Sequence, residues 1–221
     1  MYNEHCSQKE YNEHLYSGFL GLLFRYQHRK LTPKFLKNCN RVLEIGPSFE
    51  PHIKFTKLNF KEYYCLEINK SEKLKKYYKN NFPKVIFNNY DGKTLNFPDN
   101  SFDRIIISHT LEHILDFEKF LNEMLRVLKK GCVISIAIPC DNGFLFRFGR
   151  YILKKTYIKY KKKISEKDYD YFIAKEHVNT IFQILSVLRK NFTIFYEELY
   201  LPFRIKIIDI NLIYICHIIK K

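Results

Sequence analysis

The sequence predicts an α/β fold in which a mostly parallel β-sheet carries helices on both faces. Two observations predict it. Short apolar runs, of the kind that form buried strands, alternate with segments whose apolar residues recur at helical spacing. Helices that connect parallel strands cover the sheet, and 221 residues suffice for one such domain with a buried core but not for two large ones.

The first elements are a helix and a series of strands. Residues 11–37 are expected to be helical, because apolar side chains recur there at helical spacing until Thr32 and Pro33 interrupt the pattern. Apolar runs that end at glycine, proline or polar residues indicate buried strands at 41–46, 63–68, 85–89, 102–108 and 132–138.

Two helices are expected between these strands. Residues 71–80 form the first, with Ser71 as a possible N-cap. Residues 117–130 form a strongly amphipathic second helix, which Gly131 would close as the residue after its C-cap. The last part of the chain is expected to form one more helix and two closing strands, at 178–190, 192–196 and 205–219.

The chain has a formal net charge of +15 and an isoelectric point near 9.4. An excess of this size favours anionic partners such as nucleic acid, phosphorylated sugars or an acidic membrane surface. The abundance of Lys, Asn, Ile, Phe and Tyr offers another explanation, since an AT-rich genome produces the same bias. Charge alone therefore does not identify a partner.

Three other classes of protein are disfavoured. No apolar run reaches the roughly 18–20 residues that a membrane-spanning helix needs. The polar start, residues 1–10, does not resemble a secretory signal, so we expect a cytoplasmic protein. The six cysteines include no closely spaced pair, and we therefore expect reduced thiols and no bound metal.

Acidic residues end the first two predicted strands. Glu44 and Gly46 lie at the edge of the sheet where open α/β folds bind ligands, although a tight strand-to-helix connection explains this glycine equally well. Glu67 follows 23 positions after Glu44, and an acidic residue about 20 positions beyond the first turn can accept hydrogen bonds from ribose hydroxyls. Together the two motifs favour a ligand site over solvated strand ends.

Two further motifs follow the third and fourth strands. Asp91 and Gly92 come after the third strand, where a carboxylate can accept a hydrogen bond from the amino group of adenine. Ser108, His109 and His113 come at the end of the fourth strand and just beyond it. Because the carboxyl ends of parallel strands meet at one edge of the sheet, we expect all these motifs to face one crevice.

In this order and at this spacing, the motifs resemble the class I S-adenosylmethionine-dependent methyltransferases, in particular the small-molecule branch labelled methyltransferase type 11. The resemblance covers about residues 41–139. The segments that carry it are Val42–Gly46, Glu67, Asp91–Gly92, Phe102–Asp103, Leu111–His113 and Leu125–Gly131. The resemblance implies a doubly wound, seven-stranded sheet with an antiparallel last strand.

The resemblance also implies S-adenosylmethionine as the cofactor and S-adenosylhomocysteine as its product. Glu67 would hold the ribose, Asp91 the adenine, and Glu44 with Gly46 the methionine end. The full set of residues that we assign to the cofactor is Glu44, Gly46, Ser48, Glu67, Ile68, Asp91, Gly92, Ser108 and His109.

The first loop departs from the family pattern. Only Gly46 remains of its usual glycines, and Pro47 and Pro51 stiffen the turn. The cofactor has no phosphate to cradle, so a glycine-rich nest is less necessary than for a dinucleotide. A chain that kept the fold but lost the cofactor is therefore an alternative to an active enzyme.

We expect a single domain with four consecutive parts. They are an N-terminal helical cap, a cofactor-binding core, a substrate-side insertion, and a closing helix with strands, at 1–40, 41–139, 140–176 and 177–221. The predicted reaction is methyl transfer to an oxygen, nitrogen or carbon atom of a small molecule or glycan. Alignment of the reacting atoms would supply most of the rate.

His113 and His177 are the candidates for a general base, although each also has a structural explanation as a residue that shapes a loop or begins a helix. Cys140 follows Pro139, and this Pro-Cys pair resembles the one that contains the nucleophilic cysteine of cytosine-C5 methyltransferases. The flanking sequence does not support that mechanism, so we interpret Cys140 as a loop thiol.

Residues 144–163 combine aromatic and basic side chains. They include eight Lys or Arg and no acidic residue, and one helical face would carry Phe144, Phe148, Tyr151 and Ile152. A helix with a solvated basic face explains the pattern, and so does peripheral contact with an acidic membrane or with RNA. We expect an anionic small-molecule or glycan acceptor, with RNA-directed methylation as the alternative.

Overall fold

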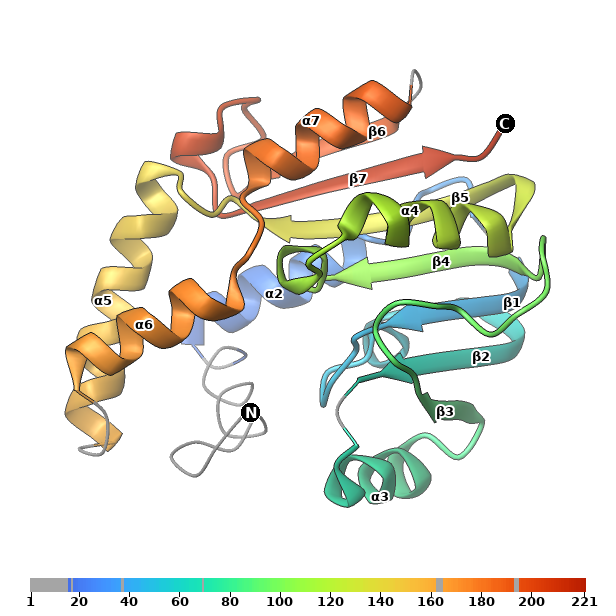
Figure 1. The fold of residues 1–221 in the computed structure, drawn as a ribbon, viewed down its shortest axis with the longest axis horizontal. Helices are drawn as coiled ribbons and strands as arrows, with labels where there is room; N and C mark the ends of the chain where they lie inside the picture. The colour runs from blue at the N-terminus through green and yellow to red at the C-terminus, as the bar shows by residue number, and fades with distance from the viewer. Residues whose placement is uncertain (1–15, 17, 37, 69, 162–164, 193–194) are drawn as a thin grey trace.

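The computed structural model describes residues 16–221, apart from 17, 37, 69, 162–164 and 193–194. In this part of the chain a seven-stranded sheet has the order β3-β2-β1-β4-β5-β7-β6 (Figure 1). Its strands are β1 (Asn38–Ile45), β2 (Asn59–Glu67), β3 (Val85–Asn89), β4 (Phe102–Ser108), β5 (Leu128–Pro139), β6 (Phe195–Leu201) and β7 (Ile213–Ile219). Strands β1 to β5 are parallel, and β7 is antiparallel to both of its neighbours. The predicted fold class is confirmed.

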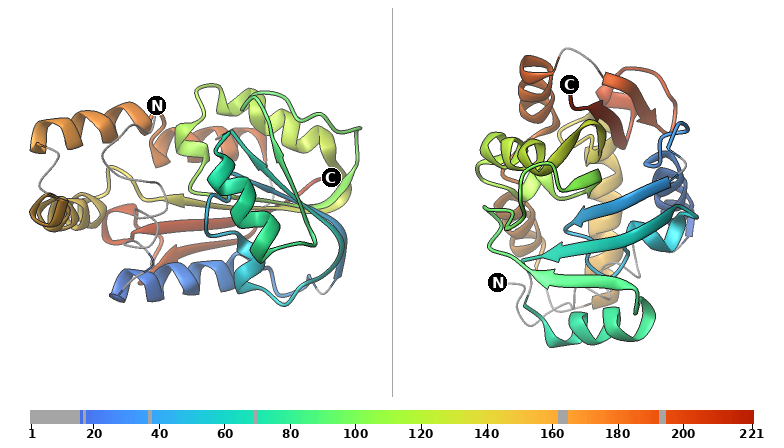
Figure 2. Two further views of the ribbon diagram at one scale, coloured as in Figure 1. Left: turned by 90° about the horizontal axis from the view of Figure 1, so that it is seen from below. Right: turned by 90° about the vertical axis from the view of Figure 1, so that its right-hand side faces the viewer.

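Helices cover both faces of the sheet, as the sequence predicts (Figure 2). They are α2 (Gly18–Lys30), α3 (Glu72–Asn81), α4 (Phe117–Val127), α5 (Phe144–Lys161), α6 (Glu166–Glu176) and α7 (Ile181–Asn191). Helices α4 and α7 pack on one face, in a core with side chains such as Leu43 and Ile105. Helices α2 and α3 pack on the other face, in a core with side chains such as Val42 and Ile106. The alternation of faces along β1 and β4 therefore produces two cores.

Helix α4 confirms the amphipathic pattern, but its predicted end is wrong. Asp116 caps the helix by accepting a hydrogen bond from Lys119 N at 3.2 Å. The helix ends at Val127, and β5 begins with the next residue. Gly131 has a φ of +73° inside β5, where its N–H donates to Lys220 O at 2.8 Å. This glycine therefore serves a strand pairing rather than a helix cap.

The closing strands also differ from their predicted ranges. Helix α7 continues to Asn191, so β6 begins at Phe195. Part of the predicted strand 205–219 is a loop, which contains the 3₁₀ turn η3 (Ile208–Ile210). The buried Asn211 side chain holds this loop, since its Nδ2 donates to the carbonyl oxygens of Ile205 and Ile207 at 2.8 and 2.7 Å. The apolar composition of this segment predicts a strand, whereas the Asn211 amide stabilises a loop.

Helices α5 and α6 lie beyond the carboxyl ends of the parallel strands, at one end of the molecule (Figure 1). They occupy the segment where we expect the substrate-side insertion, and α5 begins with Phe144 N donating to Asp209 Oδ1 at 3.1 Å. No helix among the residues that the structure describes is long and apolar enough to cross a membrane.

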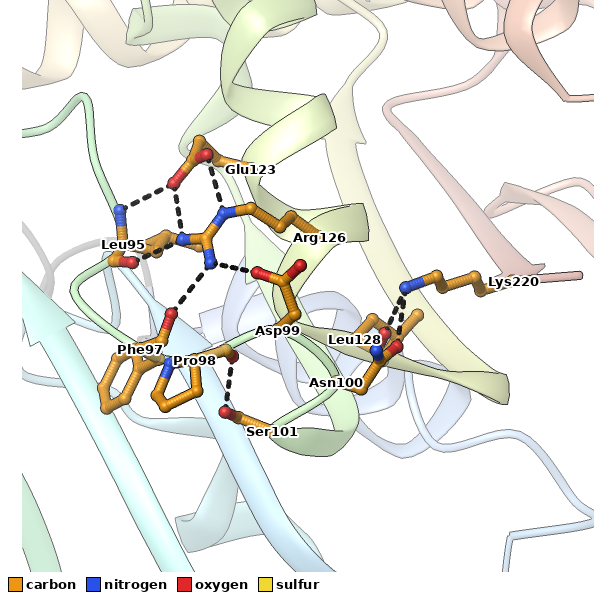
Figure 3. Close-up of polar contacts among 10 residues, drawn as sticks. All are labelled: Leu95, Phe97, Pro98, Asp99, Asn100, Ser101, Glu123, Arg126, Leu128 and Lys220. Atoms are coloured by element: carbon orange, nitrogen blue, oxygen red, sulfur yellow. Dashed lines mark hydrogen bonds and ion pairs between the residues drawn. The ribbon is translucent and has the colours of Figure 1, made fainter.

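Arg126 of α4 holds the loop that leads into β4 (Figure 3). Its Nε and Nη2 donate to the two carboxylate oxygens of Glu123 at 3.0 and 2.9 Å. Its Nη1 donates to Asp99 Oδ1 at 2.8 Å and to Phe97 O at 2.9 Å, and Nη2 also donates to Leu95 O at 2.8 Å. All five N–H donors of the guanidinium are thereby used.

Candidate active site

Gly46 lets the loop after β1 turn across the carboxyl edge of the sheet. Its φ is +68°, and its N–H donates to Leu66 O at 2.9 Å. A Cβ at this position would collide with Oγ1 of Thr110, which lies in the loop after β4. Only glycine fits this close approach between the two loops.

Glu67 fixes the next part of the same loop. Its Oε2 accepts a hydrogen bond from Ser48 N at 3.1 Å, and its Oε1 accepts one from Ile68 N at 3.0 Å. Tyr78 of α3 donates through its hydroxyl to Ser48 O at 2.8 Å. Ser48 has a φ of +48°, a conformation that side chains other than glycine adopt only where the surroundings hold them. The predicted residues Ser48 and Glu67 are therefore in direct contact.

The side chain of Glu44 lies in the interior. Its carboxylate accepts hydrogen bonds from Tyr63 OH at 2.6 Å and from the backbone N of His52 at 2.7 Å. His52 begins the 3₁₀ turn η1 (His52–Phe55), which covers this face of the sheet. Burial raises the pKa of Glu44 to about 7, and the two hydrogen bonds offset only part of this effect. Its contact with the methionine end of a cofactor stays a prediction.

Asp91 and Gly92 form a turn after β3. Oδ1 of Asp91 accepts hydrogen bonds from Lys93 N and Thr94 N, both at 2.8 Å, and these bonds lower the pKa of this exposed carboxyl. Gly92 has a φ of +77°, and a Cβ there would lie 3.2 Å from Cγ2 of Ile68. The exposed Ile68 side chain therefore lies beside the Gly92 backbone.

Gln27 of α2 connects the N-terminal helix to the end of β4. Its Nε2 donates to Ser108 Oγ at 2.7 Å, and its Oε1 accepts from Nε2 of His109 at 2.8 Å. The ring of Phe24 packs edge-on against His109, with centroids 5.4 Å apart. Burial lowers the pKa of His109 to about 3, so its imidazole is neutral at physiological pH. Its Nδ1 is then an acceptor.

The two predicted bases come together. His113 belongs to the 3₁₀ turn η2 (Leu111–His113) after β4, whereas His177 follows α6, and their rings meet edge to face with centroids 4.9 Å apart. The backbone joins the two segments, since Val178 N and Asn179 N donate to Glu112 O at 2.9 and 3.1 Å. Burial lowers the pKa of His113, and positive charge on His177 lowers it further.

Asp141 orients His177. Its Oδ2 lies 2.6 Å from His177 Nδ1 and 2.9 Å from Nη2 of Arg150 in α5. Burial acts to raise the pKa of Asp141, but the hydrogen bond from His177 and the charge of Arg150 outweigh burial and lower the pKa to about 2. The ionised carboxylate accepts a hydrogen bond from Nδ1–H, which leaves Nε2 of His177 as the proton acceptor. A base held by a carboxylate in this way can deprotonate a substrate.

Glu112 places a buried carboxyl between two histidines. Glu112 is only 2% exposed, and its Oε1 lies 3.9 Å from both His109 Nδ1 and His113 Nε2. Its Oε2 has no hydrogen-bond partner among the described residues. Burial raises the pKa of Glu112 to about 8, so this carboxyl carries a proton at neutral pH. A buried polar atom without a partner is costly, and such atoms are found at functional sites.

The predicted site residues therefore fall into two groups. The first, at the ends of β1 to β3, contains Gly46, Ser48, Glu67, Ile68, Asp91 and Gly92. The second, at the end of β4 and beyond, contains Ser108, His109, His113 and His177. Glu44 belongs to neither group. In the part of the chain that the structure describes, no three His, Cys, Asp or Glu side chains are placed to hold a metal ion.

Sequence reasoning missed Asp141 and the contact that Arg150 makes with it, and it placed Glu112 beside the crevice without giving it a role. For Asp141 a signal existed, since an acidic residue just after a strand lies at the carboxyl edge, as Glu67 does. For Arg150 no local pattern shows that α5 directs it back toward β5. Cys140 is fully buried, and burial raises its pKa to about 12, which agrees with an inert thiol.

Comparison with known proteins finds a family match for the middle of the chain. Residues 43–136 match the family described as "Methyltransferase domain". A demethylmenaquinone methyltransferase from Corynebacterium urealyticum is 39% identical over 67 residues, which cover 29% of this chain and 29% of that protein. Ajmaline N-methyltransferase from Rauvolfia serpentina is 42% identical over 53 residues, which cover 24% of this chain and 18% of that protein. Both alignments span less than a third of the relative's length.

A solved structure extends the likeness to the rest of the fold. An S-adenosylmethionine dependent methyltransferase from Mesorhizobium loti superposes with a TM-score of 0.58 at 14% identity, covering 88% of this chain and 96% of that chain. The family match itself includes the loops that hold Gly46, Glu67, Asp91 and His113. Residues 43–136 therefore match the methyltransferase domain family, and the superposition shows that the chain has the fold of a solved S-adenosylmethionine dependent methyltransferase.

Proposed function

We propose that this chain transfers a methyl group from S-adenosylmethionine to a small-molecule acceptor, and that His177 removes the proton of that acceptor. The observation that carries the proposal is the 2.6 Å contact between His177 Nδ1 and Asp141 Oδ2 at the carboxyl edge of a methyltransferase core. The family match supports the cofactor, and the Asp141–His177 pair supports the base.

The residues at the ends of β2 and β3 suit an adenosyl group. A carboxylate offers about four acceptor positions, so Glu67 can hold Ser48 and also accept hydrogen bonds from ribose hydroxyls. Ile68 offers an exposed apolar surface for adenine beside Gly92, where a Cβ would crowd the site. The ionised Asp91 suits the amino group of adenine.

The first loop suits the methionine end through its backbone rather than through Glu44. We assign Glu44 a positioning role, since it holds His52 N and so fixes the far end of the loop that begins at Gly46. Ser108 and His109 would close the site from the β4 side, where Gln27 fixes both side chains. When bound, S-adenosylmethionine supplies a methyl group on a positively charged sulfur, which is already a good leaving group.

His177 would act on an acceptor that loses a proton as it is methylated. Asp141 holds the proton on Nδ1 of His177, so Nε2 is the atom that takes the proton of a hydroxyl or amine. The carboxylate also stabilises the imidazolium that forms. His113 packs against the ring of His177 and donates from Nδ1 to Glu176 O at 2.8 Å, so it limits how far the His177 ring can turn.

The acceptor class rests on the relatives and on the charge of the insertion. Demethylmenaquinone and ajmaline, in the names of the two relatives, are small molecules. Helix α5, which contains no acidic residue, brings Arg150 within 2.9 Å of Asp141 at the site, and this positive charge favours an anionic acceptor or glycan.

Isothermal titration calorimetry with S-adenosylmethionine tests the cofactor part of the proposal. Glu67→Ala should weaken binding at least about tenfold, because the ribose hydroxyls lose a charged acceptor. Glu62→Ala is the matched control, since Glu62 lies on the same strand but pairs with Arg41 at 2.7 Å, away from the carboxyl edge. Absence of binding at millimolar cofactor would leave a protein that kept the fold without the activity.

A further inference from the structure

We propose that the outer face of α5 docks on an anionic lipid surface. The proposal concerns a different part of the molecule from the methyl-transfer site and goes beyond the proposed reaction. It depends on the exposure and charge of α5, and not on whether a cofactor binds.

The inner face of α5 is used within the protein. Arg150 lies 2.9 Å from Asp141 at the active site. Nζ of Lys154 lies 2.6 Å from Asp170 and 3.3 Å from Glu166, both in α6. Asp141, Glu166 and Asp170 therefore pair with basic residues on the inner face of α5, and their negative charge does not neutralise the outer face.

The outer face exposes large aromatic side chains. Phe144, Phe148 and Tyr151 are 64%, 53% and 52% exposed, and their spacing places them on one side of the helix. Tyr171 of the adjacent helix α6 is 70% exposed. Single exposed apolar residues are ordinary, but a contiguous aromatic face of this kind marks a contact surface.

Basic residues lie among and beside these aromatic side chains. Arg147 and Lys155 are exposed, and Nζ of Lys155 lies 4.5 Å from the centre of the Tyr151 ring. Residues 144–163 contain eight Lys or Arg and no acidic residue, in a chain of net charge +15. A helix face that combines aromatic and basic side chains can lie in the interface of an acidic bilayer.

The arrangement favours lipid over RNA. Lys155 lies over the ring of Tyr151 and so takes a face on which a base would stack. Helices α5 and α6 form the outer end of the molecule, where a flat surface can be reached (Figure 1). At a membrane surface, Lys and Tyr side chains place their apolar parts among acyl chains and their polar ends among headgroups. Tyr151 and Lys155 on the outer face of α5 are side chains of these two kinds.

Vesicle sedimentation tests the proposal without cofactor or acceptor, so its outcome is independent of methyl transfer. The full chain should bind vesicles of phosphatidylcholine with about 30% phosphatidylserine, and bind phosphatidylcholine alone at least about tenfold more weakly. Phe148→Glu with Tyr151→Glu should weaken binding to the acidic vesicles at least about tenfold, and so should Arg147→Glu with Lys155→Glu. The control is Ile86→Glu, an exposed apolar residue on β3 at the far edge of the sheet, which should bind as the unchanged chain does.

Circular dichroism should show the same thermal unfolding for each variant, because the substituted residues are exposed. The same proteins are then titrated with single-stranded RNA of mixed sequence. Failure of the unchanged chain to bind acidic vesicles would overturn the proposal. RNA binding that the α5 substitutions abolish while vesicle binding is unaffected would overturn it as well, in favour of a nucleic-acid surface.

Discussion

At the amino edge of the sheet, Arg126 gives all five N–H donors to neighbours in its own helix and the adjoining loop (Figure 3). At the carboxyl edge of the same strands, Glu112 keeps one buried oxygen without a hydrogen-bond partner among the described residues. Both side chains contact loops of the same parallel sheet, since connections leave the strands at the carboxyl edge and enter them at the amino edge. The difference between these two side chains is whether the protein alone satisfies their polar atoms.

At the carboxyl edge, burial and neighbouring charges set the protonation states of several polar side chains. Burial keeps His109 neutral and Glu112 protonated, whereas Asp141 is ionised between His177 and Arg150. Groups with strongly shifted pKa values tend to gather where chemistry takes place. The comparison indicates that the amino edge serves stability and the carboxyl edge serves function, and each of the following predictions tests one side of it.

The largest effect is expected on catalysis. His177→Ala should lower the rate of methyl transfer by about 10²–10⁴-fold, because the acceptor loses its base. Asp141→Asn should lower it by a similar factor, since an amide cannot stabilise the imidazolium. The rate is measured as S-adenosylhomocysteine formed with an acceptor found by screening hydroxyl and amine compounds. Lys175→Ala, two residues before His177 and exposed, is the control and should keep full activity.

Cofactor affinity separates this prediction from a general loss of structure. Both active-site variants should bind S-adenosylmethionine within about twofold of the unchanged chain, because neither side chain belongs to the adenosyl group of residues. Unchanged rates in both variants would mean that alignment alone drives the reaction.

The next effect is on stability at the opposite edge. Arg126→Ala should lower the free energy of unfolding by about 3 kcal/mol, since Glu123, Asp99 and two carbonyl groups lose their donor. Urea denaturation measures this loss. Arg189→Ala is the matched control, because its contact with Glu198 is long, at 3.5 Å, and its side chain is 56% exposed. Loss of activity in folded Arg126→Ala would contradict the division between the two edges.

A third effect concerns pH. The folded pKa of Glu112 is about 8, above its value of 4.5 when unfolded, so the folded state holds more protons between these limits and stability falls as pH rises through them. Glu112→Gln should abolish this loss of stability with rising pH, because Gln does not titrate. Relative to the unchanged chain, the variant should gain about 1 kcal/mol of unfolding free energy per pH unit from about pH 5 to 8. Urea denaturation at several pH values measures the difference.

Glu44→Gln sharpens the pH comparison. The folded pKa of Glu44 is about 7, so the gain of this variant should level off near that pH, whereas the gain of Glu112→Gln should continue to about pH 8. Parallel curves for the two variants would mean that burial does not distinguish these carboxyls.

The sheet was predictable because buried parallel strands leave a simple sequence signal. The predicted ranges 85–89 and 102–108 coincide with β3 and β4, whose ends are marked by polar or turn residues. Prediction failed where single hydrogen bonds decided the structure, as with the backbone bond from Gly131 to Lys220 and in the loop that the Asn211 side chain holds. It also gave no sign that Arg104, inside an apolar run, is fully buried and donates to Leu31 O at 2.8 Å.

The candidate site was predictable only where strand ends determine it. Gly46, Glu67 and Asp91 lie at the ends of strands or within two residues of them, so topology alone brings their backbones to one edge. Topology does not determine the direction of a side chain. Glu44 precedes the strand end, and its side chain faces the interior, where it accepts a hydrogen bond from Tyr63. The contact of Arg150 with Asp141 needed the path of α5, which depends on long-range packing that no local pattern records.

The smallest effect is expected for Lys220, which also lies at the amino edge (Figure 3). Its Nζ donates to Leu128 O at 2.6 Å and to Asn100 Oδ1 at 3.0 Å, and both acceptors are neutral. Water can replace the lysine at such a half-exposed position, so Lys220→Ala should cost only about 0.5–1 kcal/mol in urea denaturation, with methyl transfer unchanged. The exposed Lys130→Ala serves as the control. A cost as large as that of Arg126→Ala would show that the amino edge depends on its total charge rather than on the complete pairing of one guanidinium.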